Sequence, residues 1–341
     1  MSDLVLRRSG PHEDAEIRGV LATSFPDNPK TRAEVMAWQY WRNPFGQTCS
    51  WVWEDAGQVV AHYAAYPVPV TLAGRRTLAG VGVDASVAPS HQGRRLWTPL
   101  AKAVYADAAE HGMPITMCFP NVASTSGATK AGMEPVARLR TLVTAYDDTW
   151  LAERFRLPRP AARAVRSVAF RLAGSGLVAR EVDELPGDLD RLWERVAPAV
   201  AYGVVRDAAW WRWRYADHPD APYRVVEVRR DGELVGAAVT LVRDAFGGRF
   251  LNVLELLTVD VDAGRALAAA VRAGADDAVG AALLAVPGSQ LEALAARSGF
   301  RRLPTRLEPK PVLFGVVRND PSSPPPDSVS WSVAWGDLDH I

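Results

Sequence analysis

The chain has 341 residues and equal numbers of acidic and basic side chains, so its formal net charge at pH 7 is zero. This length suggests two domains of ordinary size, each able to bury a core of its own. Zero net charge disfavours a protein whose whole surface binds nucleic acid or membrane, and the chain has no apolar run long enough to span a bilayer.

The beginning of the chain and its cysteines indicate a cytoplasmic protein. Met1-Ser2-Asp3 leads directly into a strand-like segment, without the features of a signal peptide. The two cysteines, Cys49 and Cys118, do not have the spacing of a metal site and are typical of a reducing compartment. We therefore expect buried, inert thiols, no metal, no DNA partner and no membrane contact.

The first part of the chain alternates between strands and one helix. Leu4 to Arg7 is predicted to be a short strand, and the apolar spacing of Asp14 to Phe25 predicts an amphipathic helix. Two strands joined by a turn over 54–57 follow, and a hairpin over 73–76 leads into the next strand. The two strands are Ser50–Trp53 and Val59–Val68.

The stretch 81–97 reads V-G-V-D-A-S-V-A-P-S-H-Q-G-R-R-L-W. Apolar or small residues alternate with Gly82, Asp84 and Ser86, which predicts a strand that ends at Pro89. The helix predicted after it has an apolar face at three-to-four-residue spacing, formed by Leu96, Leu100, Val104 and Ala108.

A strand, a short polar loop and a helix in this order form a common anion-binding unit. The loop directs unpaired backbone N–H groups and the positive end of the helix dipole into one gap. A plain solvated connection has the same local pattern, so the unit alone leaves both interpretations open.

The segments after this helix add a second signature. Pro114–Phe119 is predicted to be an apolar strand, and Asn121 follows it, with Gly132-Met133 closing the segment. In this order, the elements resemble those of the GNAT superfamily of acyl-CoA-dependent N-acyltransferases, over about residues 4–140. The resemblance implies an α/β (α+β) fold with a mixed, mostly antiparallel sheet flanked by helices, and acetyl-CoA or another acyl-CoA as co-substrate.

An internal repeat indicates that the fold occurs twice. Trp38-Gln-Tyr40 recurs as Trp213-Arg-Tyr215, and the hairpin that begins at Gly57 recurs at position 232, each 175 positions later. The second copy lacks the P-S-H-Q-G-R-R loop. We therefore expect a GNAT-like domain with a cofactor loop at 1–145, a basic linker at 146–185, a degenerate GNAT-like domain at 186–318 and a Pro-rich tail at 319–341.

The linker and the tail carry further predictions. Leu151–Arg180 contains seven arginines and one acid, and we expect either a solvated basic face or contact of Arg154–Arg180 with phosphates of CoA or of tRNA. Trp331 and Trp335 are expected to dock the tail onto the body. Docking would bring Asp337 and His340 to a fixed place, where they would contact the substrate. The alternative is that the tail only covers a hydrophobic seam.

The resemblance also implies which residues bind acyl-CoA. Pantetheine would lie along Asp84–Val87, including Ala85 and Val87, and the pyrophosphate would lie on a loop of pattern Gln/Arg-x-x-Gly-x-Gly/Ala, which begins here at Gln92. The two small positions of that pattern are Arg95 and Trp97, so we expect a looser loop or side-chain contacts from Arg94 and Arg95. The full set of expected cofactor contacts is Ala85, Val87, Gln92, Gly93, Arg94, Arg95, Trp97 and Asn121.

Direct attack of an amine on a thioester requires a base and a proton donor for the leaving thiolate. Asp84 is the predicted base. The tyrosine that many family members place seven residues after the Asn is Ala128 here, so Ser124, Ser126 or water is the predicted donor. His62 and Tyr63 lie on the neighbouring strand, and one of them must face the substrate because side chains alternate along a strand.

Three hypotheses follow. The first is transfer of an acyl group from acyl-CoA to a small amine or amino sugar in a ternary complex. The second is an aminoacyl-tRNA-dependent transferase, which resembles the Fem-type enzymes in having two GNAT-like domains. The third is a non-enzymatic binding or scaffold protein built from two decayed copies.

Overall fold

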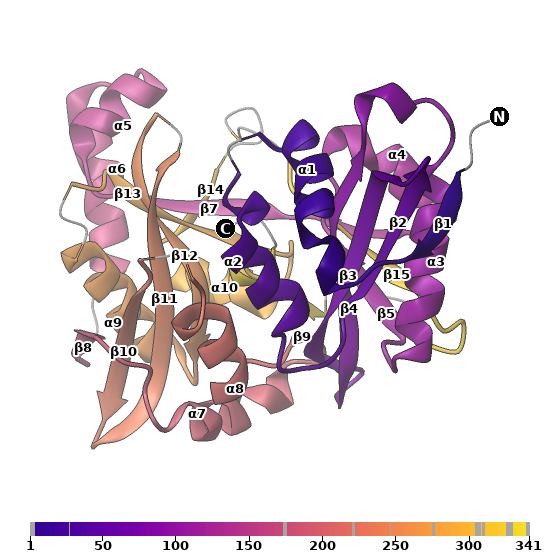
Figure 1. Cartoon of the computed structure of the whole chain (residues 1–341). Coiled ribbons are helices and arrows are strands. Elements are labelled where there is room, and N and C mark those ends of the chain that lie inside the picture. The colour runs from indigo at the N-terminus through magenta and orange to yellow at the C-terminus, as the bar shows by residue number, and fades with distance from the viewer. Residues whose placement is uncertain are drawn as a thin grey trace.

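The computed structural model describes residues 4–26, 28–172, 176–219, 222–245, 247–274, 277–303, 308, 311–324 and 330–338. These residues form two β-sheets that lie side by side, one in the indigo-to-purple half of Figure 1 and one in its pink-to-orange half. In this part of the chain, no helix has both the length and the hydropathy to span a membrane.

The first sheet has nine strands among the described residues, and most of its neighbours are antiparallel. Its main order is β1-β2-β3-β4-β5-β15-β6, and β9 pairs with both β3 and β16. These strands are β1 Val5–Arg8, β2 Cys49–Asp55, β3 Gln58–Leu72, β4 Arg75–Val87, β5 Ile115–Cys118, β6 Glu134–Arg138, β9 Tyr202–Val204, β15 Leu313–Arg318 and β16 Trp331–Ser332.

The second sheet repeats this order with seven described strands, β8-β10-β11-β12-β13-β7-β14. The one parallel pair of this sheet is β12 with β13, at the place where β4 pairs with β5 in the first sheet. These strands are β7 Arg140–Ala145, β8 Ala179–Val182, β10 Arg224–Arg230, β11 Glu233–Ala245, β12 Gly248–Thr258, β13 Gly280–Ala285 and β14 Arg301–Arg302. Both sheets have the predicted mixed, mostly antiparallel fold.

Helices flank both sheets. In the first domain α1 packs against β3 and β4, and α3 packs against β2 and β3, whereas in the second α9 packs against β10, β11 and β12. The helices and helical turns are η1 Pro11–Glu13, α1 Asp14–Ser24, η2 Pro29–Thr31, α2 Ala33–Met36, η3 Ala37–Trp41, η4 Pro89–His91, α3 Trp97–Glu110, α4 Val122–Lys130, α5 Asp148–Phe155, α6 Arg159–Leu172, α7 Leu189–Val196, η5 Ala197–Ala199, α8 Ala208–Trp211, η6 Arg212–Ala216, α9 Val261–Ala273, α10 Gln290–Arg297 and η8 Trp335–Asp337.

Strands cross between the two domains, which the expected boundaries at residues 145 and 318 do not include. Besides the two strands described next, β9 and β16 of the C-terminal half also join the first sheet. β7 follows the first domain in sequence but pairs with β13 and β14 of the second sheet, and Figure 1 shows it crossing between the halves. β15, near the end of the chain, inserts between β5 and β6 of the first sheet. Only Leu139 separates β6 from β7. A single residue cannot form a hairpin loop, so the chain continues straight into the other sheet.

The expected linker, 146–185, is also part of the folded body. It forms α5, α6 and β8, and β8 pairs with β10 at the edge of the second sheet. The sequence of this segment also predicts an apolar stripe packed across both domains and formed by Phe155, Val165, Val168 and Leu172. Phe155 packs against Trp150, whereas the side chain of Val165 is half exposed. The side chains of Val168 and Leu172 are not among those that the structure describes.

The repeated tryptophans form the contact between the domains. Trp38 lies in η3 and Trp213 in η6, two π-helical turns at equivalent positions. Their rings stack at 4.8 Å between centroids, and Trp38 Nε1 donates a hydrogen bond to the Trp213 carbonyl at 2.9 Å. Both side chains are buried. At these two positions, the recurrence in the sequence therefore reflects packing.

The tail closes the structure from the C-terminal side. Trp331 is fully buried and lies in β16, which pairs with β9, and Trp335 packs partly buried against the core. The end of the tail thus has a defined place in the fold up to residue 338.

Candidate active site

The strands β4 and β5 separate at one end, and a cavity of about 380 Å³ lies where they diverge. Their parallel pairing ends at Gly82 and Cys118. The edge of β4 beyond this point faces the cavity and offers backbone groups to a ligand. The lining residues are Phe25, Asn28, Lys30, Tyr63, Gly82, Val83, Asp84, Ala85, Trp97, Cys118, Phe119, Pro120, Asn121, Ser124 and Ala128.

Asp84 lies at a β-bulge in the wall of this cavity. The register of β3 with β4 shifts between His62 and Ala64, and Asp84 has a φ of 58°, in the left-handed region that few non-glycine residues adopt. Such a conformation costs on the order of 1–3 kcal/mol and clusters at functional sites. The side chain of Asp84 at this bulge is buried among polar side chains.

Two side chains hold the Asp84 carboxylate. Lys30 Nζ lies 2.5 Å from Oδ1, and the Tyr40 hydroxyl donates a hydrogen bond to Oδ2 at 2.7 Å. All three side chains are at least nine-tenths buried. These two contacts satisfy the hydrogen-bonding capacity of a carboxylate that is buried in the cavity wall. Neither partner was predicted from the sequence, although the recurrence of Tyr40 as Tyr215 marked one of them.

Of the two neighbouring residues on β3, Tyr63 lines the cavity and His62 does not. His62 is fully buried, its Nδ1 lies 3.1 Å from the Asp84 carbonyl, and its Nε2 lies 3.0 Å from Ser50 Oγ. Burial lowers the pKa of His62 to about 4, so the ring is neutral near pH 7. The expected substrate contact of His62 is therefore corrected: it supports the bulge from behind, because side chains alternate across the sheet.

Tyr63 connects the cavity to the cofactor loop. Its ring makes an edge contact with Trp97 at 4.8 Å, and its hydroxyl lies 3.2 Å from that of Tyr105. Burial raises the pKa of Tyr63 well above its ordinary value, so its hydroxyl stays protonated. Trp97 also touches Gly127 of α4, where an added Cβ would lie 3.0 Å from the indole. The Trp97 ring thus lies between β3 and α4, where it lines the cavity.

In the loop before α3, the position at which the expected pattern has a glycine is an arginine, but its backbone still adopts the left-handed conformation. Gly93 has a φ of 79° and Arg95 a φ of 62°, so Arg95 adopts the left-handed conformation itself. Arg94 and Arg95 are exposed, and Gln92 Nε2 donates to the Val87 carbonyl at 3.1 Å. No side chain caps the N-terminus of α3 at Leu96. Its first N–H groups therefore remain available to an anion.

Helix α4 forms the opposite wall. Asn121 caps it, accepting a hydrogen bond from the Ser124 N–H at 2.9 Å, and both residues line the cavity. Ser126 is exposed and does not line the cavity, which corrects its expected role. The reason is helical geometry, since Ser124 and Ala128 share a face and Ser126 points away from it.

Comparison with known proteins identifies this half of the chain. Residues 6–136 match the family model for an acetyltransferase (GNAT) domain. We therefore call the first domain, which contains the matched residues, the GNAT domain. No curated protein matches the sequence.

Solved structures share the fold of almost the whole chain. A probable N-acyltransferase of unknown function from Enterococcus faecalis V583 matches with a TM-score of 0.67 and 14% identity, over 94% of this chain and 74% of its own. A GCN5-related N-acetyltransferase from Anabaena variabilis ATCC 29413 matches with a TM-score of 0.67 and 12% identity, over 93% and 73%. Another from Kribbella flavida matches with a TM-score of 0.62 and 17% identity, over 92% and 71%. At these identities the likeness establishes the GNAT fold.

The helix after β12 in the second domain has a capped N-terminus, unlike α3 of the GNAT domain. This helix, α9, begins at Asp260, whose carboxylate accepts a hydrogen bond from the Ala263 N–H at 2.9 Å and pairs with Arg230 at 2.9 Å. A carboxylate already occupies the N-terminus of this helix, whereas α3 of the GNAT domain has no such cap. The phosphates of a nucleotide would meet a negative charge there.

Of the two tail residues expected to contact the substrate, Asp337 does not line the GNAT cavity. Asp337 is buried in the second domain, where it pairs with Arg206 at 2.8 Å. Asp337 therefore does not take the expected place at the substrate, because its helical turn η8 packs against β12 of the second sheet. His340 lies outside the described residues.

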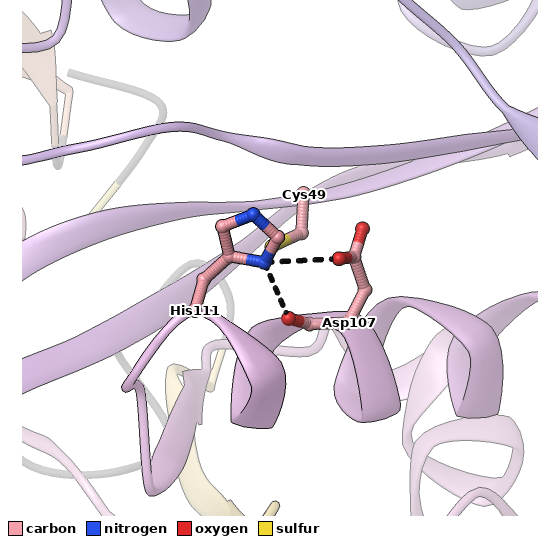
Figure 2. Close-up of side chains that lie close together, drawn as sticks. All are labelled: Cys49, Asp107 and His111. Atoms are coloured by element: carbon pink, nitrogen blue, oxygen red, sulfur yellow. Dashed lines mark hydrogen bonds and ion pairs between the residues drawn. The ribbon is translucent and has the colours of Figure 1, made fainter.

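A cysteine, an aspartate and a histidine also gather beside the GNAT sheet (Figure 2). Ligand atoms of Cys49, Asp107 and His111 lie within 4.8 Å of one another. Arg8 binds both carboxylate oxygens of Asp107, and Trp51 Nε1 donates to the same group at 2.8 Å. Burial raises the pKa of Cys49 to about 12, which keeps the thiol protonated. We interpret this cluster as structural, because Arg8 already balances the charge of Asp107.

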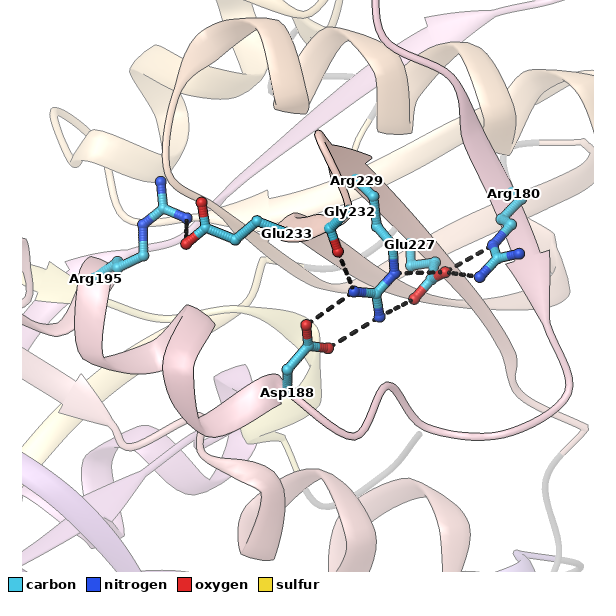
Figure 3. Close-up of polar contacts among 7 residues, drawn as sticks. All are labelled: Arg180, Asp188, Arg195, Glu227, Arg229, Gly232 and Glu233. Atoms are coloured by element: carbon cyan, nitrogen blue, oxygen red, sulfur yellow. Dashed lines mark hydrogen bonds and ion pairs between the residues drawn. The ribbon is translucent and has the colours of Figure 1, made fainter.

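Several arginines of the basic segment are paired with acids. Figure 3 shows Arg180 against Glu227, which in turn holds Arg229. Arg163 and Arg166 lie 3.6 and 3.7 Å from oxygens of Asp148. These ion pairs neutralise part of the charge that the segment shows in the sequence.

Proposed function

We propose that this protein is an acyl-CoA-dependent N-acyltransferase and that its GNAT domain contains the active site. The proposal rests on the cavity between β4 and β5, which combines a buried carboxylate at a bulge with the uncapped N-terminus of α3. Acetyl-CoA is the first donor to test. A small amine or amino sugar is the expected class of acceptor, since the cavity holds about 380 Å³.

On the donor side, this chain supplies backbone groups and two guanidinium groups. The edge of β4 around Ala85 and Val87 would bind the extended arm of the donor, as strands bind peptides. Arg94, Arg95 and the first N–H groups of α3 would bind its phosphates. Trp97 and Tyr63 would form an apolar wall for the acyl end.

On the acceptor side, the nitrogen of a neutral amine attacks the carbonyl carbon of the thioester. The C–N bond forms, the C–S bond breaks and the nitrogen loses a proton, which Asp84 accepts directly or through water. The thiolate that leaves is protonated by water or through the Ser124 hydroxyl, which lies 3.1 Å from the Asn121 side-chain oxygen. Placing both reactants in one cavity supplies much of the rate.

Titration calorimetry with acetyl-CoA tests the donor site. We expect micromolar binding, and we expect Arg94→Ala/Arg95→Ala to weaken it about tenfold, or about 1.4 kcal/mol. Arg301, an exposed arginine of the second domain, supplies the matched control, so Arg301→Ala should bind acetyl-CoA like the wild type. Absence of binding to the wild-type protein would contradict the proposal.

The aminoacyl-tRNA-dependent alternative depends on the basic segment Arg154–Arg180. Several of its arginines pair with acids, which weakens that alternative. Retention on immobilised tRNA that decreases with salt would favour it over acyl-CoA.

A further inference from the structure

The second domain contains a buried group that matches the one around Asp84. Tyr215 donates a hydrogen bond to Glu255 at 3.0 Å, and Arg206 Nε lies 2.5 Å from the same carboxylate. Tyr215 lies 175 positions after Tyr40, and Glu255 lies beside a bulge of β12 as Asp84 does in β4. Each domain therefore has a cation, a carboxylate and a tyrosine hydroxyl at one bulge.

In the second domain, this group holds a piece of incoming chain. Arg206 Nη2 donates to both carboxylate oxygens of Asp337, at 2.8 and 3.0 Å. Arg214 fixes the same piece by donating to the carbonyl oxygens of Gly336 at 2.9 Å and of Leu338 at 3.2 Å. The cation thus binds two carboxylates, one of its own domain and one that the tail delivers.

The equivalent cation in the GNAT domain is Lys30. We infer that the acceptor of the GNAT domain carries a carboxylate beside its amine, and that Lys30 binds this carboxylate while Asp84 receives the amine. An amino acid is the simplest member of this class. The inference rests on the proposed N-acyltransferase function and specifies its acceptor.

The charges in the cavity favour the same class. Among the described lining residues, Lys30 is the only cation and Asp84 the only anion. A bound zwitterion would place its carboxylate on Lys30 and its ammonium group on Asp84, in place of the contact between these two side chains. The buried site would then gain no net charge. An amine without a carboxylate brings an uncompensated positive charge, and Lys30 would repel it.

The side chains near this pair can complete the binding of a zwitterion. Asn28 and Ser124 line the same cavity and provide neutral polar groups, and Phe25 and Phe119 provide apolar surface. Phe25 also lies 4.1 Å from Lys30 Nζ, so its ring steadies the ammonium by a cation–π contact. These residues would contact the substituent of the acceptor.

A comparison of matched acceptors tests the inference. Each of a panel of L-amino acids is compared with its methyl ester and with the amine that lacks the carboxyl group, with acetyl-CoA as donor and release of the CoA thiol as readout. We expect the best free amino acid to exceed both of its matched compounds at least tenfold in kcat/KM. The amine of the ester is a weaker base than the amine of the free amino acid, so a larger fraction of the ester is neutral and able to react at pH 8. Intrinsic reactivity therefore favours the ester, which is opposite to the preference we expect from the enzyme.

Variants then assign the preference to Lys30. Lys30→Met should reduce the difference between acid and ester to less than twofold, mainly by raising KM for the acid, and Lys30→Arg should retain the preference. Asp337→Asn removes the corresponding carboxylate of the second domain and should leave the preference unchanged. The acceptor comparison on the wild-type protein remains decisive if Lys30→Met fails to fold.

The outcomes separate this inference from the proposed function. Acetylation of esters and simple amines as fast as of free acids would overturn the inference and leave the N-acyltransferase function in place. If acetyl-CoA neither binds nor releases its thiol with any acceptor, both are overturned.

Discussion

Asp84 combines backbone strain, burial and an ion pair at one residue. Its left-handed φ of 58° places the carboxylate between Lys30 and Tyr40, in the wall of the cavity. Strain of this kind persists only where the surrounding structure enforces it. The same residue occupies the position where the proposed reaction needs a base.

Replacing Asp84 tests this role directly. Asp84→Asn keeps the shape of the side chain but removes the base, so we expect kcat/KM with acetyl-CoA to fall about 10²- to 10⁴-fold, the usual contribution of a general base. Glu255→Gln makes the equivalent change in the second domain and should leave kcat/KM within twofold of the wild type. An Asp84→Asn protein that retains full activity would refute the assignment.

His62 makes the stability of the first domain depend on pH. Its pKa in the folded state, about 4, lies below the ordinary value of 6.5 because the ring is buried. Between these values the unfolded chain binds more protons, so the free energy of unfolding falls as the pH decreases from 6.5 to 4, by about 3 kcal/mol from this residue.

Urea unfolding at several pH values measures this effect. The His62→Gln protein should lose less stability than the wild type between pH 6.5 and 4, whereas His12→Gln, at an exposed histidine, should keep the wild-type slope. Identical slopes for all three proteins would contradict the burial of a neutral His62.

At the scale of elements, each domain has a helix whose N-terminus is capped by a side chain, and only one of these two caps lies beside the cavity. Asn121 caps α4 beside the cavity, and Asp260 caps α9 in the second domain. Loss of either cap costs about 1 kcal/mol of stability. Only the first cap holds a wall of the proposed donor site.

A pair of cap variants separates stability from binding. We expect Asn121→Ala and Asp260→Ala each to lower the free energy of unfolding by about 1 kcal/mol. Calorimetry should show weaker acetyl-CoA binding for Asn121→Ala and wild-type binding for Asp260→Ala. Weakened binding in both variants would mean that the second domain contributes to the donor site.

At the scale of the whole molecule, the strand exchange makes the two domains one folding unit. β15 lies between β5 and β6 of the first sheet, and β7 lies between β13 and β14 of the second. Without β15 the first sheet would have a gap between β5 and β6, and without β7 the second sheet would have a gap between β13 and β14. Each gap would expose two strand edges.

We therefore expect the fragment 1–139 to remain unfolded or to aggregate, and to fold when it is co-expressed with the fragment 140–341. Circular dichroism and gel filtration measure this, and the full chain should unfold in a single cooperative transition. A soluble, folded fragment 1–139, or two separate transitions in the full chain, would show that the exchanged strands are dispensable.

Local patterns in the amino-acid sequence determine much of this protein. Strand alternation and helical spacing predict the strands β1 to β5 and the helices α1 and α3, but not the helical turns between 29 and 41. The order of the predicted elements indicates the GNAT fold, and the repeat at a constant offset predicts a second sheet. Such patterns depend on neighbours in the chain, because alternation and helical period are local properties. Asp84 is predicted as the base from the family resemblance, which places the thioester beside its strand, and this role stays a prediction.

Contacts between distant positions come from the packing alone. Lys30 and Tyr40 meet Asp84 only because the turn η2 and the π-helical turn η3 fold against β4, and no local pattern encodes that contact. Packing decides on which face of β3 the cavity lies, and so whether His62 or Tyr63 lines it. The burial of Asp337 depends on the packing of η8 against β12, and the exchange of β7 into the second sheet depends on strand pairing. That exchange depends on a connection of one residue, Leu139, too short to turn the chain back into its own sheet.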